Sequence, residues 1–147
     1  MIDLQEKEEH NRPELLKILC ILTFIGSGLS LLSNSIMFMT IDIIREYYKN
    51  GMFDFLAEDM DIGVLEILFS INASYFIFQA ALFSLTIYGT YLMWNLKKYG
   101  FRIYAIAQIL LLILPQVFLP SLPFPTFELI VSLIFITLYA KNLQYMS

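Results

Sequence analysis

The chain has 147 residues, of which 59% are hydrophobic and only 15% carry a charge. Soluble domains carry a charge on about a quarter of their residues, so this composition excludes an ordinary water-soluble domain and indicates that a bilayer surrounds most of the chain. The net charge of −4 and the lack of a basic stripe argue against nucleic acid as a partner.

The first predicted membrane span covers residues 15–40 and follows a tail of residues 1–13 that is acidic. A secretory signal would begin with a basic region and end in a small-residue cleavage site. This apolar run is longer than such a signal and carries Gly and Ser in its middle. We therefore predict a retained transmembrane helix, long enough to cross a hydrocarbon core of ~30 Å.

Small and polar residues recur at helical spacing within this first span. Gly26, Ser30 and Asn34 are four positions apart, and Ser27 and Ser33 flank them. In lipid, such a face lets another helix backbone come close, and hydroxyl and amide groups can hydrogen-bond across the contact. We predict helix docking here, either on the chain's own spans or on a different subunit or second copy.

Residues 41–66 form the longest segment that is predicted to lie outside the membrane. Its first part has helical periodicity, and Asn50-Gly51 is a plausible helix stop. We predict one or two short amphipathic helices at the membrane surface. Aromatic anchors and acidic groups would suit a basic patch on a partner. The residues predicted to form this outward partner surface are Tyr47, Tyr48, Phe53, Phe55, Glu58, Asp59 and Asp61.

The second span is predicted at residues 67–95, and a basic loop of residues 96–102 connects it to a third span at residues 103–119. Pro115 interrupts the third span after about 18 Å of helix, which is too short to cross a membrane. We predict that the helix kinks at this proline and then continues to the end of the span.

A proline-rich turn of residues 120–125 separates the third span from the fourth, which is predicted at residues 126–143 before a tail of residues 144–147. Glu128 lies in the first turn of the fourth span, where a carboxylate complements the helix dipole. The predicted fold class is all-α: a single membrane domain built as an integral membrane four-helix bundle, with one or two short amphipathic helices between spans 1 and 2.

Lys and Arg gather on one side of this topology, which predicts cytoplasmic N- and C-termini by the positive-inside rule. The other side has only Arg45 and Lys49, in a segment that holds seven acids. The seven basic residues on the predicted cytoplasmic side are Lys7, Arg12, Lys17, Lys97, Lys98, Arg102 and Lys141.

Four amide side chains are predicted to be buried inside the bundle: Asn72, Gln79, Gln108 and Gln116. An amide in hydrocarbon needs a hydrogen-bonding partner, so these groups are expected to face the interior. Lining a solute path is the functional alternative. Because no span has a charge near its centre, the transporter interpretation is weakened.

The sequence predicts no catalytic, cofactor or metal site. One cysteine, Cys20, and one histidine, His10, can form neither a disulfide nor a paired-histidine ligand set, and no nucleophile–base set can be assembled. The stretch Asp59-x-Asp61-x-Gly63 lacks the further oxygen ligands of a calcium loop. We expect that the protein is not an enzyme.

The stretch from Arg12 to Gly28, RPELLKILCILTFIGSG, resembles the opening of a group of small four-span bacterial membrane proteins. In that group an Arg-Pro pair leads into an apolar helix with a Gly-Ser-Gly-type stretch. The resemblance implies a multi-pass protein of the bacterial inner membrane, and it implies no activity.

Three functions remain open. The first is a non-catalytic accessory or assembly subunit that docks on a larger inner-membrane protein or complex. The second is a self-assembling carrier or channel for a small or lipid-like solute, for which a homo-oligomer would be expected. The third is an envelope sensor or regulator that acts through the outward acidic segment. In each case the lipid bilayer is itself a partner.

Overall fold

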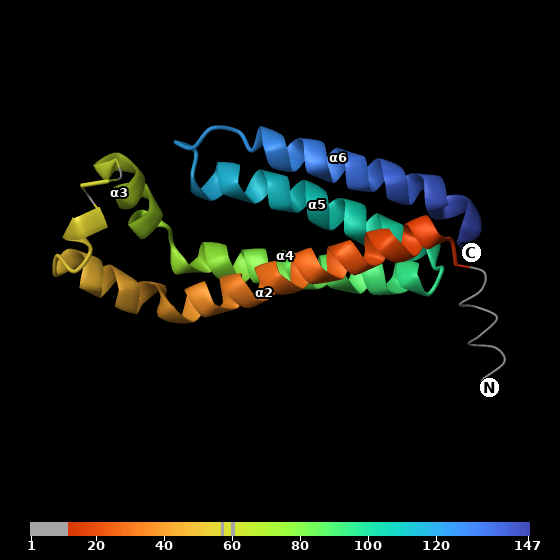
Figure 1. Cartoon of the computed structure of the whole chain (residues 1–147), viewed down its shortest axis with the longest axis horizontal. Coiled ribbons are helices and arrows are strands. Elements are labelled where there is room, and N and C mark those ends of the chain that lie inside the picture. The colour runs from red at the N-terminus through yellow and green to blue at the C-terminus, as the bar shows by residue number, and fades with distance from the viewer. Residues whose placement is uncertain (1–11, 57, 60) are drawn as a thin grey trace.

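The computed structural model describes residues 12–56, 58–59 and 61–147, and it shows an all-α protein (Figure 1). Four of its helices are long and apolar enough to cross a membrane, the last of them together with the 3₁₀ turn that follows it. The predicted four-helix membrane bundle is therefore confirmed. Its helices are α2 (Glu14–Lys49), α3 (Ile62–Ser70), α4 (Ala73–Trp94), α5 (Lys98–Phe118) and α6 (Thr126–Lys141), with 3₁₀ turns η1 (Asp54–Leu56) and η2 (Asn142–Tyr145).

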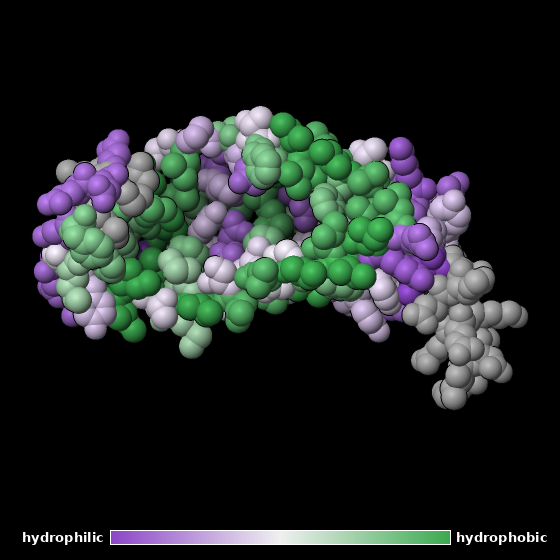
Figure 2. Space-filling model, viewed as in Figure 1, coloured by the Kyte–Doolittle hydropathy of each residue, from purple (hydrophilic) through white to green (hydrophobic). Residues whose placement is uncertain are grey.

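The bundle has two distinct ends (Figure 1). The end that we call the terminal end holds the start of α2, the connection between α4 and α5, and the C-terminus. The opposite end, the α3 end, holds α3 and the end of α2. Helix α4 lies along α2, α5 packs against α4, and α6 lies beside α5. Large apolar side chains cover the outer faces of the long helices, as a bilayer requires (Figure 2).

Helix α2 is longer than the span predicted from the sequence. The prediction ended the membrane helix at residue 40 and placed separate short helices after it, but α2 continues without a break to Lys49. Its 36 residues measure about 54 Å, so it extends well beyond a ~30 Å hydrocarbon core. The helix stops at Asn50, as predicted, and Gly51 follows with a φ of +78°, a conformation that glycine adopts without strain.

The segment predicted as the second span consists of two helices. Helix α3 ends at Ser70, and α4 begins at Ala73, so the prediction of one continuous helix over residues 67–95 was wrong. The reason is local: Asn72 has an extended backbone, and its side chain accepts a hydrogen bond from the Ser74 amide at 3.0 Å. An asparagine at this position starts a helix rather than continuing one.

The fourth helix follows its predicted boundaries closely, whereas the third begins earlier than predicted. Helix α5 begins at Lys98, so most of the predicted basic loop of residues 96–102 is helical. Helix α5 passes through Pro115 and ends at Phe118, and the Leu119 amide donates to the Pro115 carbonyl at 2.7 Å in the last turn. The proline-rich turn then leads into α6, which begins at Thr126 as predicted. Of the predicted tail of residues 1–13, residues 1–11, with Lys7 and His10, lie outside the described residues.

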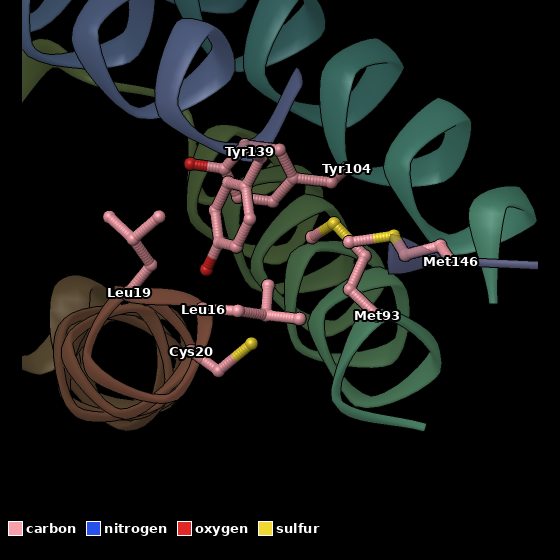
Figure 3. Close-up of a cluster of buried hydrophobic side chains, with 7 residues drawn as sticks. All are labelled: Leu16, Leu19, Cys20, Met93, Tyr104, Tyr139 and Met146. Atoms are coloured by element: carbon pink, nitrogen blue, oxygen red, sulfur yellow. The ribbon is translucent and has the colours of Figure 1, made fainter. Parts of the chain in front are cut away.

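The best-packed core lies at the terminal end, where all four long helices meet (Figure 3). The rings of Tyr104 and Tyr139 pack edge to face there, with their centroids 4.8 Å apart. The Tyr139 hydroxyl lies 2.7 Å from Thr23 Oγ1 and so connects α6 to α2. The buried members of this core are Leu16, Leu19, Cys20, Met93, Tyr104, Tyr139 and Met146.

Both ends of the described chain are fastened to the end of α4. Arg12 donates from Nε to the Trp94 carbonyl at 2.7 Å, and its guanidinium lies 4.2 Å from the centre of the indole ring. The amide of Ser147 donates to the Leu96 carbonyl at 2.8 Å. These contacts fix one end of the bundle firmly.

Candidate functional site

The structure divides the predicted helix-docking face of α2. Ser27 is buried against the bundle, whereas Gly26 and Ser33 are exposed. Asn34 donates to the Ser30 carbonyl at 2.8 Å, which is a bond within its own helix. A β-carbon added at Gly26 would meet no atom within 4 Å. Among the described residues, no other helix of this chain therefore packs closely on Gly26.

Close approach between helices occurs at a different pair of glycines, Gly89 of α4 and Gly100 of α5. A β-carbon on Gly89 would lie 2.8 Å from the Tyr104 nitrogen and 2.9 Å from the Gly100 carbonyl oxygen. A β-carbon on Gly100 would overlap the Gly89 carbonyl oxygen. This crossing was not predicted from the sequence. The available signal was a glycine within two turns of each side of the short connection at residues 95–97.

The predicted outward partner surface is partly used inside the molecule. Phe69 of α3 stacks on Tyr48 at a centroid distance of 4.3 Å and on Phe53 at 5.8 Å. Tyr48 and Phe53 therefore hold α3 against the end of α2. Tyr47 and Phe55 remain exposed.

The acidic members of that surface, Glu58, Asp59 and Asp61, are all exposed. Asp61 also has a structural role, since its side chain accepts from the Gly63 amide at 2.9 Å and caps α3. Within the described ranges, no three His, Cys, Asp or Glu side chains lie close enough together to hold a metal ion.

The four predicted buried amides have different environments. Asn72 is exposed and caps α4, so its predicted burial was wrong. Gln116 is half-buried, and its amide nitrogen has no hydrogen-bond acceptor among the described residues. Gln79 and Gln108 both line one cavity, described next.

A cavity of about 380 Å³ lies between α4, α5 and α6. Figure 2 shows the molecule hollowed in its middle, with hydrophilic residues inside a largely hydrophobic rim. Its volume falls in the range of small-molecule sites, roughly 300–1,000 Å³. The polar lining residues are Tyr75, Gln79, Gln108, Glu128 and Ser132, and the others are Phe83, Leu111, Leu112, Pro115, Pro125, Phe127 and Val131.

A hydrogen-bonded group of side chains connects three helices at this cavity. Ser132 of α6 donates to Gln108 Oε1 of α5 at 3.1 Å. Gln108 Nε2 in turn lies 3.5 Å from the hydroxyl of Thr86 on α4, which is a long contact. Separately, Gln79 Nε2 donates to the Tyr75 hydroxyl at 2.7 Å. The amide of Gln108 is thus the centre of the polar wall.

The cavity forms because α6 is attached mainly near its C-terminal end. Tyr139 and Asn142 are buried there, whereas the residues of α6 before Ser132 are exposed or only half-buried. Residues Pro123 and Pro125 bring the chain into α6 without a helical connection to α5. Glu128, in the first turn, is exposed and contributes the one carboxylate of the lining.

Sequence reasoning missed Tyr75 and Ser132 as parts of this site and assigned Glu128 only to the helix dipole. A usable signal was present. Ser132 is four residues after Glu128, so both lie on one face of α6, and Tyr75 is four residues before Gln79 on α4. What spacing alone could not show is that these two faces enclose the same space.

Comparisons of the chain with protein-family models, with curated proteins and with solved structures found no match.

Proposed function

We propose that the protein is a multi-pass membrane protein that holds a small amphipathic or lipid-like molecule in the cavity between α4, α5 and α6. The observation that carries this proposal is the cavity's wall: an apolar lining of bilayer-compatible residues that contains two amides, a phenol, a serine hydroxyl and a carboxylate. A mostly apolar pocket with a few convergent polar groups is typical of ligand sites.

Binding fits this wall better than catalysis. The polar lining residues are mostly neutral hydrogen-bonding groups, and a nucleophile paired with a base is not among them. Amides and hydroxyls in a low-dielectric site orient a polar end group through hydrogen bonds. A carrier or holder of an amphipathic molecule needs no more than this.

The proposed setting is the bacterial inner membrane with both termini in the cytoplasm. Arg12, Lys17, Lys97 and the basic residues in the first turns of α5 lie at the terminal end, which supports this orientation. The proline-rich turn would then face outward, and the cavity would open in the outer half of the bilayer. A reporter that fluoresces only in the cytoplasm should be active at the C-terminus and inactive in the loop at residues 120–125.

Photocrosslinking in nanodiscs tests the binding site directly. A monoacylglycerol with a photoreactive group on its acyl chain should label the walls of the cavity, Phe83, Leu112 and Val131. Excess unlabelled monoacylglycerol should prevent this labelling. Leu22 and Leu29, exposed on α2, provide the internal control for general contact with lipid. Labelling of α2 and the cavity walls to the same extent, without competition, would overturn the proposal.

A second candidate function is the accessory subunit that docks on a larger membrane protein or complex. One observation favours it: Gly26 and Gly28 of α2 have open space where a β-carbon would lie, so a partner's helix could approach the backbone there. Gly26→Leu should then remove a co-purifying partner and leave the fold intact. Purification of the wild-type chain in a mild detergent without any stoichiometric partner would contradict this function.

A further inference from the structure

The charged part of the cavity lining is negative. Glu128 supplies a carboxylate at the start of α6, and none of the lining residues in the described chain is Lys, Arg or His. Near apolar walls a carboxylate repels an anion and attracts a cation more strongly than it would in water. The head group of an anionic amphiphile would therefore meet repulsion here.

The basic side chains of the described residues lie outside the cavity lining. Arg45, near the α3 end, donates to the Phe69 carbonyl at 2.8 Å and pairs with Asp42 at 2.9 Å. Lys49 is at the C-terminal end of α2. The other described basic residues belong to the terminal end: Arg12, Lys17, Lys97, Lys98, Arg102 and Lys141. An anion in the cavity would lie against apolar walls without a basic side chain of the described lining as its counterion, which is unfavourable.

A neutral polar group would find a partner in Gln79. This side chain is only 9% exposed, and one end of its amide is bonded to the Tyr75 hydroxyl. No described residue hydrogen-bonds to the other end of the amide, Gln79 Oε1, and Gln79 is a residue of the cavity lining. A buried amide in a membrane protein needs such a partner, and a hydroxyl or amide of a bound molecule would supply it.

We propose that the cavity selects amphipathic molecules whose polar end is uncharged or cationic and discriminates against anionic ones. This selectivity rests on the proposed function of the same cavity. Gln79 recognises the neutral hydrogen-bonding group, and Glu128 adds attraction for a cationic one.

Competition against the photoreactive monoacylglycerol tests the selectivity. Full-length protein in nanodiscs is titrated with dodecylamine, dodecanoylglycerol or dodecylsulfonate, which share one chain length and differ in the charge of the head group. Dodecylamine and dodecanoylglycerol should compete, and dodecylsulfonate should compete at least about ten-fold more weakly, since its charge would lie beside a carboxylate and apolar walls with no cation in the lining. Control measurements in protein-free nanodiscs correct for the different partitioning of the three probes.

Two variants and one control separate the roles of the residues. Glu128→Gln should weaken competition by dodecylamine by up to about five-fold, the upper end of the range for an exposed charge pair, and leave dodecanoylglycerol unchanged. Gln79→Leu should weaken dodecanoylglycerol several-fold. Glu66→Gln, an exposed acid of α3 outside the lining, should change neither.

The outcomes distinguish the two proposals. If dodecylsulfonate competes as well as dodecylamine while the label stays in the cavity, the selectivity is overturned and the binding function stands. If the photoreactive probe does not label the cavity at all, the binding function itself is wrong.

Discussion

Gly89 and Gly100 lie against each other where α4 crosses α5, and neither position has room for a β-carbon. The carbonyl of each glycine occupies the space that the other's side chain would need. This contact closes the bundle at the terminal end. The cavity lies towards the opposite end of the same helix pair, where α6 forms its third wall.

Alanine substitutions at the α4–α5 crossing and on the open face of α2 should therefore have different effects on stability. Gly100→Ala and Gly89→Ala should destabilise the protein by about 1–3 kcal/mol, since backbone atoms must move to make room. Gly26→Ala and Gly28→Ala should be neutral or slightly stabilising, because the added methyl group meets no atom within 4 Å and alanine favours the helix. Thermal unfolding of the purified protein in one detergent measures all four. An equal loss of stability in Gly26→Ala and Gly100→Ala would contradict the close contact of α4 and α5 at Gly89 and Gly100.

The bond between α2 and α6 makes a second prediction. Thr23 Oγ1 donates to its own helix at the Leu19 carbonyl, 2.8 Å away, so Tyr139 is the donor in the 2.7 Å contact with Thr23. Tyr139→Phe should reduce the free energy of unfolding by roughly 0.5–1.5 kcal/mol. Tyr145→Phe, at an exposed ring, is the control and should have no effect. A double-mutant cycle with Thr23→Val should give a coupling energy above zero; additive effects would exclude the bond.

Gln108 and Gln116 offer a matched pair of amides on one helix. Gln108→Leu removes the acceptor of Ser132 and should destabilise the protein by about 1 kcal/mol. Gln116→Leu should be neutral or stabilising, because the Gln116 amide nitrogen is buried without an acceptor in the described chain. The stability ranking of the two variants in the same detergent is the test, and the reverse ranking would show that Gln108 does not connect the helices.

Arg45 should control how firmly α3 is held. Its bond to the Phe69 carbonyl lies at the C-terminal end of α3, where a cation also complements the helix dipole, whereas its partner Asp42 is 79% exposed and adds little. Arg45→Ala should speed hydrogen exchange of the α3 amides by roughly five-fold or more, with the exchange of α5 unchanged. Lys49→Ala is the control on the same helix. Unchanged exchange in α3 would mean that the Tyr48–Phe69 stack suffices.

The sequence was sufficient to predict the four spans, because apolar runs of membrane length and the proline-rich turn have few alternative folds in a bilayer. It did not predict the break at Asn72, since a capping asparagine within an apolar run looks like one more buried amide. The small-residue face of α2 was a reasonable prediction for close packing, yet the tight crossing formed at two isolated glycines. Which helix faces meet depends on how the whole bundle packs, and the spacing of residues along one helix does not determine this packing.

The same limit applies to the cavity. Gln79 and Gln108 were expected to face the interior, and the structure places both in the cavity wall. Spacing places Tyr75 on one face with Gln79 and Ser132 on one face with Glu128. That the two faces enclose one space follows only from the position of α6 beside α4 and α5. Helix α6 is attached to the bundle through Tyr139, near its C-terminal end. The cavity beside its N-terminal half is therefore a consequence of tertiary packing.

The most direct test of the account fills the cavity from one of two adjacent residues of α6. Val131 lines the cavity, and Ile130 is exposed on α6 without lining it. Native mass spectrometry of wild-type protein taken from its own membrane should detect one bound amphiphile per chain. That molecule should be lost in Val131→Trp and kept in Ile130→Trp. Retention in both variants, or a wild-type protein that carries no such molecule, would contradict the proposal that this cavity is the functional site.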